Sequence, residues 1–145
     1  MDVLVCSRHN ISKISPSVPY AVISIVEPNN SYALFNLENN LLKNYIFLRY
    51  ADEDNYQDAK FYGREKFLFS DEQAQLVVNF VNNTKDEVEL IVCQCDGGVS
   101  RSSATAAAIL VYLHGSKADE QIFKSPQYVP NMYVYRKLLN AFFKM

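Results

Sequence analysis

Residues 91–103 read IVCQCDGGVSRSS and join two segments of different character. The residues from Val88 to Val92 are mostly apolar and β-branched, which is typical of a buried strand. The residues from Ala104 to Leu113 are rich in Ala, Ile and Leu and predict a buried helix. The sequence therefore predicts a strand that passes through a tight loop into a helix.

The loop brings a cysteine and an arginine together. Cys95 and Arg101 enclose five residues, two of them glycines, so the backbone can curl and turn successive N–H groups inward. The following helix adds its first unpaired N–H groups and the positive end of its dipole. Such an arrangement is typical of a phosphate site, and we expect it to be formed by Asp96, Gly97, Gly98, Val99, Ser100 and Arg101.

The same loop favours chemistry at sulfur. A helix N-terminus and a neighbouring guanidinium stabilise a thiolate relative to the thiol, which makes Cys95 a candidate nucleophile. Arg101 can hold two oxygens of one phosphoryl group with its planar fork, which a lysine cannot do. Ser102 follows directly, and we expect its hydroxyl to donate to the sulfur when the sulfur leaves phosphorus.

Cys95 to Arg101, followed by Ser102, resembles the Cys-x5-Arg-Ser/Thr signature of the cysteine-dependent protein tyrosine and dual-specificity phosphatases. The likeness is to the small single-domain form found in bacteria and their phages. Three further segments fit that group loosely, namely Val3–Arg8, Phe47–Asp52 and Pro130–Tyr133. The resemblance implies hydrolysis of phosphomonoesters through a phosphocysteine intermediate, without a metal or another cofactor.

A phosphatase of this type also needs an acid that protonates the departing oxygen. Asp52 is the first candidate, because it closely follows a strand-like run at the place where the resembled family carries its acid. Asp54 is the second candidate and Glu53 the third. The alternative is that these carboxylates form only a solvated turn. The 43 positions from Asp52 to Cys95 exceed the spacing in many relatives, and the extra length falls within residues 56–69.

Strand-like and helical patterns alternate along the chain. Strands are predicted over residues 2–6, 20–26 and 45–50, and helices over 71–83, 117–123 and 132–143, whereas residues 31–44 carry no clear pattern. Ser70 and Gln73 match a capping box at the start of the first of these helices. This order predicts an α/β fold with a mainly parallel sheet of four to five strands and helices on both faces. We expect a single domain over residues 1–145, with its site beyond the carboxyl ends of the strands.

Composition excludes several classes of protein. The net charge is −2 and the basic residues are scattered, which argues against nucleic acid as a partner. The lack of a long apolar stretch and of a basic, then apolar, N-terminal region argues against a membrane span and a signal peptide, so we expect a cytoplasmic protein. Three cysteines without paired spacing argue against disulfides and zinc, and Cys6 and Cys93 are interpreted as strand residues in the core.

Three functional hypotheses follow. The first is a phosphatase acting on phosphorylated proteins, on phosphotyrosine and also on phosphoserine or phosphothreonine. The second is a catalytically weak phosphate-binding pseudophosphatase, because Gln94 stands where the family usually has a histidine before the nucleophile. The third is a phosphatase of a non-protein phosphoester, such as a phosphoinositide, a nucleotide or an RNA 5′ end. Asp96 gives the loop an acid and no lysine accompanies it, which argues against a highly anionic substrate. The oligomeric state stays open.

Overall fold

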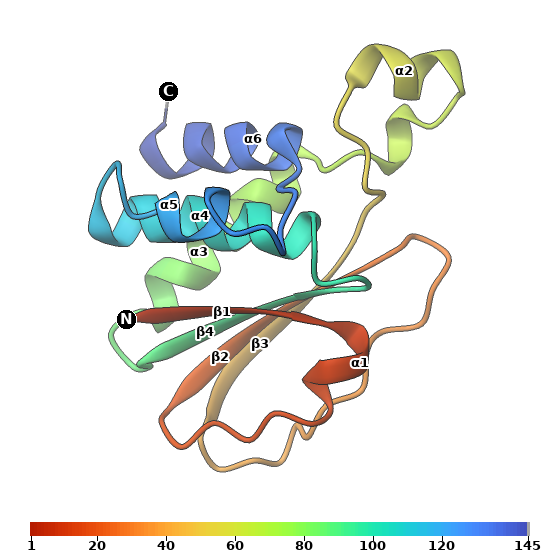
Figure 1. Ribbon diagram of the computed structural model, residues 1–145. Coiled ribbons are helices and arrows are strands. Elements are labelled where there is room, and N and C mark those ends of the chain that lie inside the picture. Colours follow the sequence, from red (N-terminus) through yellow and green to blue (C-terminus); the bar gives the residue numbers. More distant parts are fainter. Residues whose placement is uncertain (145) are drawn as a thin grey trace.

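Four strands form one parallel sheet in the computed structural model, which describes residues 1–144 (Figure 1). The strands lie in the order β1-β4-β2-β3. Their bounds are Asp2–Ser7 for β1, Tyr20–Val26 for β2, Leu42–Arg49 for β3 and Leu90–Cys95 for β4. The predicted fold class, an α/β protein with a parallel sheet between helices, is confirmed.

Helices cover both faces of the sheet. One face carries α3 (Asp71–Thr84), α4 (Arg101–His114), α5 (Glu120–Phe123) and α6 (Met132–Phe143), and the other carries α1 (Arg8–Ile11) (Figure 1). Between β3 and α3 the chain forms α2 (Tyr56–Phe61) and a short 3-10 helix, Glu65–Phe67, which stand apart from the layers (Figure 1). No helix within residues 1–144 is long and apolar enough to cross a lipid bilayer.

The central position of β4 fixes the place of the loop. This strand pairs with β1 on one side and with β2 on the other, and its residues from Ile91 to Cys95 are all buried. A strand that is buried on both faces reads as a continuous apolar run, which explains why its first half was recognisable from the sequence. Cys95 ends β4 at the carboxyl edge of the sheet, beside Ser7 at the end of β1.

Each face of the sheet has its own apolar core. The larger core lies under α3, α4 and α6, where Ala104, Ala106, Ala107 and Ala108 have no exposed surface and let α4 lie close to the strands. The smaller core contains Cys6 and the α1 residue Ile11 on the opposite face. Cys6 and Cys93 are both buried free thiols, as expected from the sequence, and they belong to different cores.

Most predicted elements lie where the patterns placed them, and β2 and α6 have the predicted bounds. The capping box is present, since Ser70 Oγ accepts from the backbone N–H of Gln73 and the side chain of Gln73 accepts from that of Ser70. Other bounds differ from the predictions. The third strand begins at Leu42 rather than at residue 45, and the helix after the loop begins at Arg101 rather than at 104. The strand before the loop is shifted to Leu90–Cys95, the helix predicted over 117–123 is shortened to Glu120–Phe123, and α2 was not predicted.

Candidate active site

The loop between β4 and α4 is pressed against the end of β1. Gly98 has a positive φ of 68°, a conformation that favours glycine. A Cβ atom at this position would lie 2.7 Å from the backbone nitrogen of Ser7 and 2.9 Å from the carbonyl carbon of Cys6. At Gly97 a Cβ atom would meet nothing within 4 Å. Gly98 is therefore the glycine that the folded loop requires.

The curled loop leaves several hydrogen-bond donors free. Among residues 1–144, the backbone N–H groups of residues 97–100 donate to no protein acceptor, and the first N–H groups of α4 have no partner within a helix. The carbonyl groups of the same loop are used, because Val99 and Ser100 accept from the backbone N–H groups of Val129 and Asn131, both at 3.1 Å. Donors without partners beside a helix N-terminus are an arrangement suited to bind an anion.

Cys95 and Ser102 meet at the base of this loop. Cys95 Sγ lies 3.0 Å from Ser102 Oγ, and both residues are buried. At this distance the Ser102 hydroxyl can donate a hydrogen bond to the Cys95 sulfur, as expected from the sequence. Ser102 lies in the first turn of α4, so the helix start that supplies N–H groups also holds the hydroxyl.

Arg101, the first residue of α4, has only 4% of its surface exposed. Its Nη1 donates to the carbonyl oxygen of Tyr50 at 2.9 Å, and its Nη2 lies 3.0 Å from Glu27 Oε1 and 3.7 Å from Asp96 Oδ2. Its Nε is buried and has no hydrogen-bond partner in the described part of the chain. The guanidinium is thus held in place by three groups. A buried donor without a partner is unfavourable, and a ligand that accepts a hydrogen bond from Nε would remove this cost.

Gln94 directly precedes Cys95 and is completely buried. Its Oε1 accepts a hydrogen bond from the hydroxyl of Ser24 on β2, and its Nε2 donates to the carbonyl oxygen of Ile25 at 3.4 Å. The amide is thus hydrogen-bonded at both ends and ties β4 to β2 directly below the loop.

Asp96 uses its carboxylate inside the protein. The carboxylate accepts from the backbone N–H of Glu27 at 2.8 Å and from the guanidinium of Arg8 at 3.3 Å. Arg8 in turn donates to the carbonyl oxygens of Ser31 and Tyr32, at 2.6 and 3.1 Å. This network joins the loop to the segment that follows β2. The charge of Asp96 is therefore paired with Arg8, which weakens the sequence-based argument against a highly anionic substrate, while Glu27 adds a second carboxylate 3.0 Å from Arg101.

Asp52 lies against the loop. Its Oδ1 accepts from Ser100 Oγ at 2.8 Å and from Asn131 Nδ2 at 2.9 Å, whereas its Oδ2 accepts from no residue in the range 1–144. Asn131 Nδ2 also donates to the carbonyl oxygen of Glu53 at 3.0 Å, while its Oδ1 caps α6 through the N–H of Val134. The loop and the start of α6 thus orient Asp52 and leave one of its oxygens free.

The other two candidate acids have different surroundings. Glu53 forms an ion pair with Arg64 at 2.7 Å. Asp54 is exposed and lines a cavity of about 360 Å³ together with Asp52, Val99, Ser100, Val129, Pro130 and Asn131. Of the three carboxylates, only Asp52 forms a hydrogen bond with the loop. Its assignment as the acid stays a prediction.

Several contributors to the site carry little sequence signal. Asn131 matches an N-cap pattern, which predicts its bond to α6 but not its bond to Asp52. Glu27 and Arg8 are ordinary charged residues near strand ends, and Tyr50 contributes through its backbone.

Among the described residues no group of three or more His, Cys, Asp or Glu side chains is arranged to hold a metal ion.

Tyr50 adds a second buried polar group to this region. Burial raises the pKa of its phenol well above the usual range, and the positive charge of Arg101 only partly opposes this effect. Thr105 is close enough to act on the phenol, but no hydrogen bond of normal geometry reaches the Tyr50 hydroxyl from within residues 1–144. The hydroxyl therefore remains protonated and unsatisfied beneath the loop.

No protein-family model matches the sequence, and no curated protein matches it. Solved structures do match. Tk-PTP in its active form has a TM-score of 0.61 at 15% identity, covering 100% of this chain and 94% of that one. PTPMT1 in complex with PI(5)P has a TM-score of 0.61 at 14% identity, and the match covers 99% of this chain and 91% of that one. Another PTPMT1 structure has a TM-score of 0.54 at 15% identity, and the match covers 99% of this chain and 90% of that one. The chain therefore has the fold of protein tyrosine phosphatase-like proteins along its whole length.

Proposed function

We propose that this protein is a cysteine-dependent phosphatase that hydrolyses phosphomonoesters of proteins. The observation that carries the proposal is the buried guanidinium of Arg101, whose Nε has no acceptor within residues 1–144 beside a loop of unpaired N–H groups. Cys95 lies in that loop with its sulfur 3.0 Å from the hydroxyl of Ser102. A trigonal phosphoryl group would satisfy these donors above the sulfur.

In the first step the Cys95 thiolate attacks phosphorus. The S–P bond forms while the bond from phosphorus to the ester oxygen breaks, and Asp52 gives that oxygen a proton from Oδ2. Arg101 and the N–H groups of residues 96–101 hold the three equatorial oxygens. The leaving group departs as a neutral alcohol or phenol, and the phosphoryl group stays on sulfur.

In the second step water attacks the phosphocysteine. Asp52, now a carboxylate, takes the proton of the water, the S–P bond breaks, and inorganic phosphate leaves. Ser102 donates to the departing sulfur and stabilises it as the thiolate. Both steps return Cys95 and Asp52 to their starting forms, so the cycle needs no further reactant.

The test is p-nitrophenyl phosphate turnover as a function of pH. Cys95→Ser is expected to abolish turnover, and Arg101→Lys to lower kcat by roughly 100-fold or more, because a lysine cannot replace the two-pronged donor. Asp52→Asn should lower kcat by about 100- to 10,000-fold and remove the basic limb of the pH profile, whereas Asp54→Asn should do little. Equal losses in the two Asp variants would overturn the choice of acid. Full activity of Cys95→Ser would overturn the proposal.

A phosphoinositide is the second candidate substrate. PTPMT1, which has the same fold, was crystallised with PI(5)P, and the Asp96 carboxylate is balanced by Arg8. Comparison of kcat/KM for phosphotyrosyl peptides and for short-chain PI(5)P distinguishes the two substrates. The pseudophosphatase hypothesis is less well supported, because both ends of the Gln94 amide are hydrogen-bonded and the position is structurally filled. Phosphate binding without turnover would favour it.

A further inference from the structure

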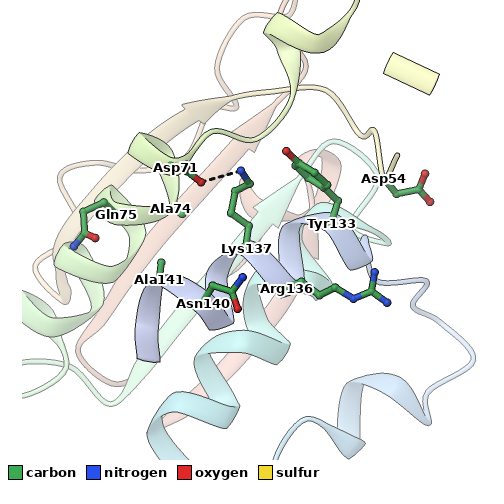
Figure 2. Close-up of a pocket in the computed structure, with 9 residues that line it drawn as sticks. All are labelled: Asp54, Asp71, Ala74, Gln75, Tyr133, Arg136, Lys137, Asn140 and Ala141. Atoms are coloured by element: carbon green, nitrogen blue, oxygen red, sulfur yellow. Dashed lines mark hydrogen bonds and ion pairs between the residues drawn. The ribbon is translucent and has the colours of Figure 1, made fainter. Parts of the chain in front are cut away.

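A second cavity adjoins the proposed active site. It has a volume of about 510 Å³ and lies between the first turns of α3 and one face of α6 (Figure 2). Asp71 and Ala74 line it from α3, and Tyr133, Arg136 and Lys137 line it from α6. These three residues of α6 are spaced at i, i+3 and i+4, so they share one side of the helix. We call this cavity the α3–α6 groove.

The groove and the cavity over the loop lie on either side of one shared residue. Asp54 lines both cavities, and the cavity over the loop is also lined by Asp52 and Ser100. A molecule bound at the loop would have to pass Asp54 to reach the groove. A small phosphoester ends before this point, whereas a polypeptide continues on both sides of its phosphorylated residue.

Of the two basic side chains in the groove, Lys137 is already paired with a carboxylate and Arg136 is not paired with any within residues 1–144. Lys137 Nζ lies 2.9 Å from Asp71 Oδ1 and 5.0 Å from the centre of the Tyr133 ring. Figure 2 shows Lys137 turned toward Asp71, with Arg136 turned the other way. Arg136 is exposed and forms no ion pair with any residue of the described chain. Arg136 is thus the cation of the groove that is free to bind an anion.

We propose that the α3–α6 groove binds the polypeptide next to the phosphorylated residue, and that Arg136 receives an acidic side chain of that polypeptide. This inference rests on the proposed phosphatase function. The guanidinium of Arg136 then holds the substrate carboxylate with two parallel hydrogen bonds, and the ring of Tyr133 contacts its aliphatic part.

The experiment compares kcat/KM for phosphopeptides with acidic, neutral or basic flanking residues, using phosphotyrosyl and phosphoseryl series and p-nitrophenyl phosphate as the small substrate. The readout is the ratio of kcat/KM for a Glu-flanked peptide to kcat/KM for p-nitrophenyl phosphate. Arg136→Ala is expected to lower this ratio about tenfold, mainly through KM, because a charge-assisted hydrogen bond is lost. Lys117→Ala, which removes an exposed lysine beyond the far end of α4, is the charge-matched control and should leave the ratio as in the wild type.

A charge swap gives a second, independent readout. Arg136→Glu should prefer Lys-flanked over Glu-flanked peptides, which reverses the order expected for the wild type. The inference is overturned if Arg136→Ala lowers kcat/KM equally for acidic and neutral peptides, or if its loss appears with short-chain PI(5)P instead. If the wild type hydrolyses neither p-nitrophenyl phosphate nor any peptide, the proposed function itself fails. Active enzyme with an unchanged ratio in Arg136→Ala refutes the groove assignment alone.

Discussion

Replacing Gly98 with alanine should destabilise the protein far more than the same change at Gly97. At Gly98 the φ of 68° disfavours any side chain by about 1–2 kcal/mol. The new Cβ would also lie 2.7 Å from the backbone nitrogen of Ser7, which cannot rotate away. Overpacking of this kind adds roughly 1–3 kcal/mol. The free energy of unfolding should therefore fall by about 2–5 kcal/mol, a large share of the roughly 5–15 kcal/mol of a typical domain.

Urea denaturation measures this difference. The chain has no tryptophan and 10 tyrosines, so unfolding is followed by tyrosine fluorescence and by far-ultraviolet circular dichroism. Gly97→Ala is the matched control, because its Cβ would meet nothing within 4 Å, and its urea midpoint should stay close to that of the wild type. If Gly98→Ala has the wild-type midpoint, or if both variants lose stability equally, the loop is not packed against β1 as described.

Three further predictions follow from the site and its surroundings. Asn131→Asp keeps an oxygen to cap α6 but replaces the donor to Asp52 with a like charge, so kcat for p-nitrophenyl phosphate should fall about tenfold with little change in the urea midpoint. Burial raises the pKa of the Cys6 thiol to about 12 and that of the Cys93 thiol further. Above about pH 9 the folded state therefore holds protons that the unfolded state has lost, and the free energy of unfolding should fall by up to ~1.4 kcal/mol per pH unit and thiol. The fall should be less steep in a variant with both cysteines replaced by alanine. Tyr50→Phe removes a buried hydroxyl without a hydrogen-bond partner within residues 1–144 and should raise the free energy of unfolding or leave it unchanged; a loss above about 1 kcal/mol would show that the hydroxyl is satisfied in solution.

Local patterns were sufficient for the centre of the fold. The apolar run that became β4 and the alanine-rich run that became α4 each carry their structure in their own composition, and two glycines between them mark the loop. The parallel sheet then followed from the alternation of strands and helices. The position of Cys95 at the carboxyl edge is a consequence of this order, and the sequence predicted it for that reason.

Other features depend on contacts between distant residues. The strand β3 begins at Leu42, because pairing with β2 extends it into a segment without its own strand pattern. The helix α2 has six residues and lies in a segment where no apolar periodicity marks it. The links from Asp52 to Asn131, from Arg101 to Glu27 and from Asp96 to Arg8 join residues more than 70 positions apart, and no local rule predicts them.

The position of Asp96 shows how such contacts change a functional argument. In the sequence it is an acid in a loop that would bind an anion, which disfavours a highly charged substrate. In the structure its carboxylate is bound by Arg8 and by the N–H of Glu27, so it acts as a support of the loop. We therefore expect the choice between phosphoproteins and phosphoinositides to depend on the surroundings of the loop, among them the proposed α3–α6 groove, rather than on the loop itself.

A crystal structure with bound vanadate would show whether the loop holds an oxyanion above the sulfur. We expect vanadium bonded to Cys95 Sγ, its equatorial oxygens accepting from the N–H groups of residues 96–101 and from Arg101 Nε, and Asp52 Oδ2 beside the axial oxygen. Vanadate bound elsewhere, or a Cys95 thiol turned into the core with residues 95–101 extended, would contradict the proposed mechanism.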